Sequence, residues 1–168
     1  MCCIFLSFFS IYFLLRSKMK SKEKHMNALD KLKKGGGKLT GTVTATVVDS
    51  EGKESNFQSE SIYGSYNDER VYVRVAGRDR LLDIYFVIPR RFIGDNPITD
   101  EGHIMFQVQS SPSAQWYAQY GAVNIENNII TDYRGKFNVR KREEGDPDMS
   151  AALNGSFSVN FEAKMSSK

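Results

Sequence analysis

The sequence predicts an all-β protein: a single antiparallel β-sandwich or up-and-down β-barrel of about eight strands, preceded by a non-globular apolar and basic leader. Apolar and polar residues alternate over most of residues 39–168, and a period of two is typical of strands with one buried face. Turn-forming residues separate these runs at short intervals, and no segment shows the spacing of an amphipathic helix. The 168 residues suffice for one domain.

The clearest run extends from Arg70 to Ile88 and predicts a central β-hairpin. Valine occupies every second position from 71 to 75, and apolar residues occupy every second position from 82 to 88. The four residues 76–79 between them contain a glycine and predict the turn. With such a short turn, Val75 is expected opposite Arg80, with the valines facing the core.

Further strands are expected before and after this hairpin, although not all of them are regular. Phe57 and Ile62 fall on opposite parities of one strand, which predicts a bulge or a strand edge. Residues 89–102 contain two prolines and two glycines and are expected to form an irregular crossover or a functional loop. Asn127 and Asn128 predict a tight turn. The additional strands are expected at residues 39–49, 55–63, 103–109, 114–126, 129–140 and 153–163.

The positive charge of the chain is concentrated in residues 1–38, which hold nine Lys or Arg against two Asp or Glu. Residues 39–168 hold fourteen against eighteen, so the predicted β domain is mildly acidic. The glycines at 35–37 mark the boundary between the leader and this domain.

The leader opens with an apolar run, Cys2–Leu15, of 14 residues, which is shorter than the roughly 20 that a membrane-spanning helix requires. One interpretation is a dispensable or mis-assigned start, because Met19 and Met26 offer later starts. Another is a membrane anchor or uncleaved signal, with the following basic residues holding the domain on the cytoplasmic side. We therefore expect a cytoplasmic protein, or alternatively one anchored to the membrane.

The composition of residues 39–168 disfavours several kinds of function. Their acidic balance lacks the basic field of a nucleic-acid-binding domain. Both cysteines, Cys2 and Cys3, precede the domain, which excludes an internal disulfide, a thiol nucleophile or a thiolate metal site within it. Its single histidine, His103, has the polar parity of its strand and is expected at the surface. We expect no metal and no cofactor, and the sequence singles out no catalytic residue.

The main candidate for a binding site is the polar face of the central hairpin together with the start of the following loop. Arginine recurs there, and its planar guanidinium binds carboxylates or phosphates and stacks on tyrosine. A solvated face with cross-strand ion pairs explains the same residues more simply. The candidate ligand-binding residues are Arg70, Tyr72, Arg74, Asp83, Tyr85, Arg90 and Arg91.

A second candidate is the aromatic group Trp116, Tyr117 and Tyr120, which could stack sugar rings if it were exposed. A lone tryptophan in a small β domain is more often part of the core.

These residues predict a non-enzymatic binding or interaction module for an anionic small molecule or a protein partner. The alternative is a membrane-associated β domain that contacts lipid through residues 1–34. An enzyme using carboxylates and arginines ranks last, because no nucleophile–base arrangement can be written from these residues. The sequence leaves the oligomeric state open.

Overall fold

A computed structural model describes residues 37–49, 51–78, 82–99, 103–109, 115–141 and 151–162. Every regular element in these ranges is a β-strand, so the all-β prediction is confirmed. The predictions for the apolar run and the basic leader lie outside the described residues. In the part of the chain that is described, no helix has the length and apolarity needed to cross a bilayer.

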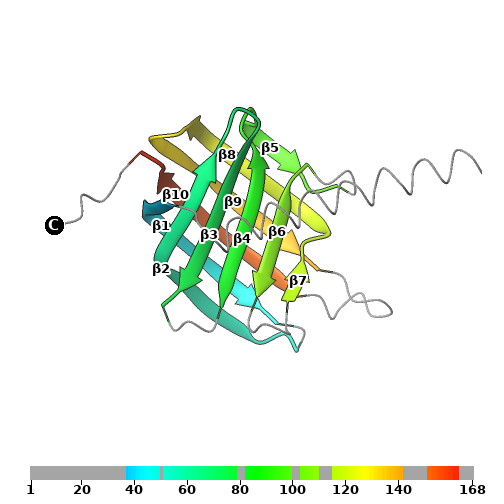
Figure 1. The fold of residues 1–168 in the computed structure, drawn as a ribbon. Coiled ribbons are helices and arrows are strands. Elements are labelled where there is room, and N and C mark those ends of the chain that lie inside the picture. Colours follow the sequence, from blue (N-terminus) through cyan, green and yellow to red (C-terminus); the bar gives the residue numbers. More distant parts are fainter. Residues whose placement is uncertain are drawn as a thin grey trace, which may run out of the picture.

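Ten described strands form one antiparallel sheet, in the spatial order β5-β8-β9-β10-β1-β2-β3-β4-β6-β7. The sheet curls into a half-barrel, in which the green strands β2, β3, β4 and β6 lie in front of the yellow-to-red strands β8, β9 and β10 (Figure 1). The strands are β1 (Gly37–Val48), β2 (Glu54–Tyr66), β3 (Arg70–Gly77), β4 (Asp83–Pro89), β5 (Gly94–Pro97), β6 (Met105–Gln109), β7 (Gln115–Tyr117), β8 (Tyr120–Ile129), β9 (Asp132–Arg140) and β10 (Ala152–Asn160).

One apolar core fills the space between the two walls of the half-barrel. The three alternating valines of β3 are fully buried in it, as predicted. Phe86 of β4 packs against Phe106 and against Phe157 of the opposite wall, with ring centroids 5.3 and 5.2 Å apart. The aromatic side chains therefore connect strands that are distant in the sequence.

The central hairpin pairs in a different register from the predicted one, because its loop is longer than four residues. The ladder ends where Ala76 faces Asp83, and Val75 lies opposite Ile84 rather than Arg80. This displacement is an even number of residues, so each side chain keeps its predicted face of the sheet.

The bulge predicted in β2 is confirmed. Phe57 and Ile62 are both buried in the core despite their opposite parity, because the pairing of β2 with β3 shifts register between Ser59 and Ser61. An extra residue in one strand moves the following side chains to the other face, which restores both residues to the core.

The segment between β4 and β6 is more regular than predicted, since it contains the short strand β5. This strand pairs with β8 at one edge of the sheet, and Pro97 is its last residue. Proline is tolerated there because an edge strand needs no partner for one row of its N–H groups. The segment crosses to the other wall of the half-barrel, where β5 pairs with β8, and then returns to β6 beside β4.

The strand predicted at residues 114–126 is divided into β7 and β8 by two residues. The N–H of Ala118 donates to the carbonyl of Phe106 in β6 (3.0 Å), and the N–H of Gln119 donates to that of Arg140 in β9 (2.9 Å). Two consecutive residues thus bond to strands near opposite ends of the sheet order. No local sequence pattern distinguishes such a change of partner from a continuous strand.

The tight turn predicted at residues 127–128 lies instead at Ile130 and Thr131. Asn127 belongs to a second bulge, at which the pairing of β8 with β9 shifts register. Its amide Nδ2 donates to Asp132 Oδ2 (2.8 Å), and its Oδ1 accepts from the N–H of Ile129 (3.1 Å). The asparagine therefore shapes the approach to the turn without being in it.

We predict that Val73→Asp and Phe157→Asp will each lower the free energy of unfolding by about 3 kcal/mol or more, because each buries an unpaired charge. Urea denaturation of the full chain measures the loss. Ser158→Asp is the matched control, since its side chain is exposed next to Phe157 and should change stability little. A comparable loss in that control would contradict the assignment of the inner face.

Candidate functional site

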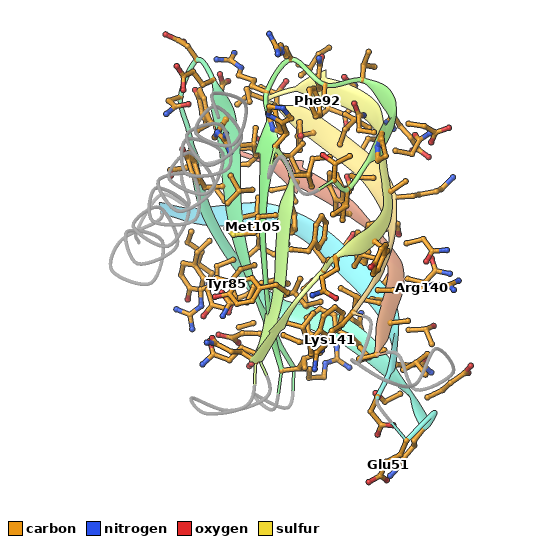
Figure 2. All side chains as sticks on the ribbon, turned by 90° about the vertical axis from the view of Figure 1, so that its right-hand side faces the viewer. Glu51, Tyr85, Phe92, Met105, Arg140 and Lys141 are labelled. Carbon is orange, nitrogen blue, oxygen red and sulfur yellow. The ribbon has the colours of Figure 1, made fainter. Side chains whose placement is uncertain are left out.

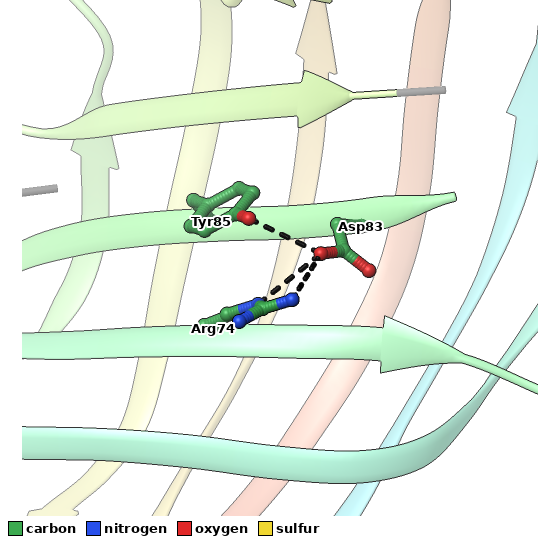
Figure 3. Close-up of polar contacts among 3 residues, drawn as sticks. All are labelled: Arg74, Asp83 and Tyr85. Carbon is green, nitrogen blue, oxygen red and sulfur yellow. Dashed lines mark hydrogen bonds and ion pairs between the residues drawn. The ribbon is translucent and has the colours of Figure 1, made fainter. Parts of the chain in front are cut away.

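Three of the predicted site residues, Arg74, Asp83 and Tyr85, meet on the outer face of the central hairpin. Asp83 Oδ2 accepts hydrogen bonds from Arg74 Nε (3.1 Å), Arg74 Nη2 (2.8 Å) and the Tyr85 hydroxyl (3.1 Å) (Figure 3). The guanidinium also lies 5.7 Å from the centroid of the Tyr85 ring. This trio satisfies its own charges, so an anionic ligand at Arg74 would have to displace an internal carboxylate.

Burial, more than the charges of the trio, keeps the Tyr85 hydroxyl protonated. Burial raises the pKa of Tyr85 to about 12, and the charge of Asp83 adds to that effect while Arg74 opposes it. A protonated hydroxyl is the form that donates to Asp83. The arrangement therefore supports a structural role for Tyr85 rather than proton transfer near neutral pH.

The rest of this face is less polar than the sequence suggests. Tyr72 packs with Met105 against the buried side chains of Tyr85 and Val87. Arg70 Nη1 donates to the backbone carbonyl of His103 at 3.4 Å. His103 is exposed, as predicted.

Arg90 follows β4 and reaches another part of the molecule. Its N–H donates to the carbonyl of Glu69 in the β2–β3 turn (2.8 Å), and this bond ties the chain after β4 to that turn. Its guanidinium lies 5.3 Å from the centroid of the Tyr66 ring and 3.7 Å from a carboxylate oxygen of Asp68. Asp68 is fully exposed, so this ion pair is weak.

Arg90 and Arg91 line an open hollow of about 580 Å³, which we call the end hollow. It lies where the β2–β3 turn, the chain after β4, the β8–β9 turn and the chain after β10 meet. Phe92 is labelled at this end of the sheet, opposite the end that carries Glu51 (Figure 2). The other residues lining it are Asp68, Asn128, Ile129, Ile130, Thr131 and Glu162.

Hydrogen bonds from backbone N–H groups hold the turns around the end hollow. Asn67 Oδ1 accepts from the N–H groups of Glu69 (3.0 Å) and Arg70 (2.7 Å) in the β2–β3 turn. The N–H of Phe161, after β10, donates to the carbonyl of Ile130 in the β8–β9 turn (3.1 Å). The hollow is therefore built on turns with defined geometry.

The structure thus divides the predicted site residues between two places. Arg74, Asp83 and Tyr85 form one cluster, whereas Arg90 and Arg91 line the end hollow. The six other residues of the hollow were not among the predicted site residues. The pair Asn127–Asn128 was the one signal for the β8–β9 turn. No local sequence pattern indicated that this turn lies near Arg90.

The aromatic candidate occupies β7 and the start of β8. Trp116 is partly buried and packs against the main core. Tyr117 and Tyr120 expose 38% and 51% of their surface. The lone tryptophan contributes chiefly to the core.

Neither metal-site geometry nor similarity to known proteins points to a function. Among the described residues, no group of three or more His, Cys, Asp or Glu is placed to hold a metal ion. Comparisons with family models, with curated proteins and with solved structures find no match.

We predict that the free energy of unfolding falls as the pH rises from about 10 to about 12. Tyrosines in the unfolded chain ionise near pH 10, whereas Tyr85 in the folded protein ionises near 12. In this window the unfolded state binds fewer protons, so stability is lost with increasing pH. Tyr85→Phe should reduce the fall measured by denaturation at several pH values, and an unchanged slope would contradict the raised pKa.

Proposed function

We propose that this chain is a non-enzymatic binding module that holds a carboxylate or phosphate group in the end hollow. The observation that carries the proposal is the exposure of the Arg91 guanidinium and its lack of a partner among the described residues. The Arg91 side chain is exposed beside Arg90 in the hollow, and no ion pair or hydrogen bond is found for its guanidinium within the described residues. A free guanidinium presents a planar set of donors that matches both anions.

The two arginines differ from Arg74 in how easily a ligand could reach them. Arg74 is 2.8 Å from the partly buried carboxylate of Asp83, whereas Arg90 is 3.7 Å from the exposed carboxylate of Asp68. Displacing a long, solvated ion pair costs little. The end hollow is therefore the better anion site.

The other lining residues narrow the class of ligand. Asn128 and Thr131 offer neutral hydrogen bonds, and Ile129 offers an apolar surface. Asp68 and Glu162 would repel a second negative charge. A small molecule or peptide segment with one acidic group and at least one hydrogen-bond donor fits this lining best.

We also infer that the half-barrel is an up-and-down barrel of about eight strands, with β7 and β8 acting as one strand bent at residues 118–119. The hydrogen bonds of those two residues to β6 and β9 support this description. In this barrel, β5 is an additional strand that pairs with β8 and is not one of the eight. The end hollow then lies at a mouth of the barrel, where binding sites in barrels are common.

We predict that the full chain binds inorganic phosphate or glycolate and that Arg91→Ala weakens this binding about tenfold, as loss of a charged hydrogen bond implies. Amide chemical shifts of Ile130 and Thr131 in an NMR titration provide the measurement. Arg91→Lys should give an intermediate affinity, because lysine keeps the charge and loses the planar fork. Arg140→Ala is the matched control, since Arg140 is exposed outside the hollow. Absence of shifts with both anions, or equal affinity for Arg91→Ala, would refute the proposal.

A second candidate function is contact with an anionic lipid surface, because exposed isoleucines accompany the arginines. Ile129 in the hollow and Ile93 in the loop between β4 and β5 are each 59% exposed. Apolar side chains beside cationic ones suit the boundary between acyl chains and anionic headgroups.

For this candidate, we predict that the full chain sediments with vesicles containing phosphatidylserine and that Ile93→Asp combined with Ile129→Asp reduces the bound fraction. Vesicles of phosphatidylcholine alone are the control. If the double variant binds as well as the unmodified chain, the lipid contact lies elsewhere, as residues 1–34 would predict.

A further inference from the structure

The outer side of β3, β4 and β6 carries a second apolar cluster, separate from the core. We call its members, Tyr72, Tyr85, Val87 and Met105, the outer patch. Tyr85 lies on the side of the green strands that faces away from the opposite wall (Figure 2). The exposed fraction of Tyr85 is only 2%, and that of Val87 is 0%.

Such burial is exceptional for the outside of this sheet. On β9, the outward side chains of Arg134, Lys136 and Asn138 are all exposed, and so are those of Ser156 and Ser158 on β10. Neighbouring strands cover only the flanks of an outward side chain, so complete burial requires another layer above it. Among the described residues, the apolar side chains that pack on the buried pair are Tyr72 and Met105, and the guanidinium of Arg74 lies over the Tyr85 ring. All three residues belong to the sheet itself.

A buried polar group supports the same conclusion. Gln107 is the residue of β6 that pairs with Tyr85, and it is only 1% exposed. Its Nε2 donates to Gln115, while its Oε1 is buried and has no hydrogen-bond partner in the described part of the chain. The covering layer should therefore be mainly apolar and should offer at least one donor.

We propose that the apolar run Cys2–Leu15 of this same chain covers the outer patch. No other undescribed stretch is a long apolar run, since 79–81, 100–102, 110–114, 142–150 and 163–168 are short and mostly polar or charged. The run also carries three hydroxyl groups that can donate to Gln107, on Ser7, Ser10 and Tyr12.

The position at which the described chain begins places the run within reach. Gly37 pairs with Gly64 of β2, and the next residue of β2, Ser65, pairs with Tyr72 of the outer patch. Three strand spacings of about 4.8 Å separate β1 from β4, which is about 14 Å. The intervening residues 16–36 would span about 25 Å as a flexible coil. The run can therefore reach the patch without strain.

Covering by the chain itself gives residues 1–36 a role distinct from anchoring. The run would form part of the folded domain, and the full chain would hide its longest apolar segment from water. This inference is independent of anion binding in the end hollow, because it involves the outer wall of the sheet.

The test measures the accessibility of the outer patch in the full chain. In a Cys2→Ser, Cys3→Ser background, Met105→Cys places one thiol in the patch, and Ser156→Cys places a control thiol on the exposed outer face of β10. We expect maleimide to label the patch thiol at least about tenfold more slowly than the control. Adding Phe8→Glu and Phe9→Glu should raise the patch rate to that of the control and leave the control unchanged.

Four results would overturn the proposal. Equal labelling of both thiols would show that the patch is open, and protection that survives the two glutamates would show that another segment covers it. Protection that disappears on dilution would assign the cover to a second copy. Protection that appears only with vesicles would assign it to lipid.

A second measurement decides the question if the glutamate variant does not fold by circular dichroism. With the native Cys2 and Cys3 retained, Met105→Cys should form an intramolecular link to them with a flexible bis-maleimide, identified by peptide mass spectrometry. Ser156→Cys in the same background should form far less of it. Equal linking at both positions would contradict the proposal.

Discussion

Aromatic packing between its two walls holds the curled sheet together. Phe86 and Phe106 lie on one wall and Phe137 and Phe157 on the other, with ring centroids 5.2 Å apart for Phe86–Phe157 and for Phe106–Phe137. Gly135 provides the space, because a Cβ there would lie 2.9 Å from the ring of Phe157. These contacts hold together strands that the chain order separates, and they join the two walls of the sheet.

The two arginines Arg74 and Arg91 differ in their position on the sheet. Arg74 lies in the middle of a wall, where cross-strand pairing supplies Asp83 and Tyr85 as partners. Arg91 lies at the end of the walls, where the chain leaves the sheet and the ladder supplies no partner. The same residue type is therefore structural at one position and chemically available at the other.

Strands β3, β4 and β6 carry apolar side chains on both faces, unlike β9 with its exposed outer residues. A strand buried on both sides usually lies between two layers. This difference within a single sheet is the reason for assigning a covering layer to one wall alone. It also explains why Tyr85, on the face predicted to be polar, is buried.

Which side chains face the core can be predicted from the sequence alone, and the opposite parity of Phe57 and Ile62 indicated the irregularity in β2. Facing follows from the two-residue repeat of an extended chain, which is a local property. Three features follow only from the folded structure: Val75 pairs with Ile84, the chain changes partner at residues 118–119, and Arg91 lines the same hollow as Thr131. Each of these depends on contacts between residues far apart in the sequence, and such contacts are selected by how well the whole core packs.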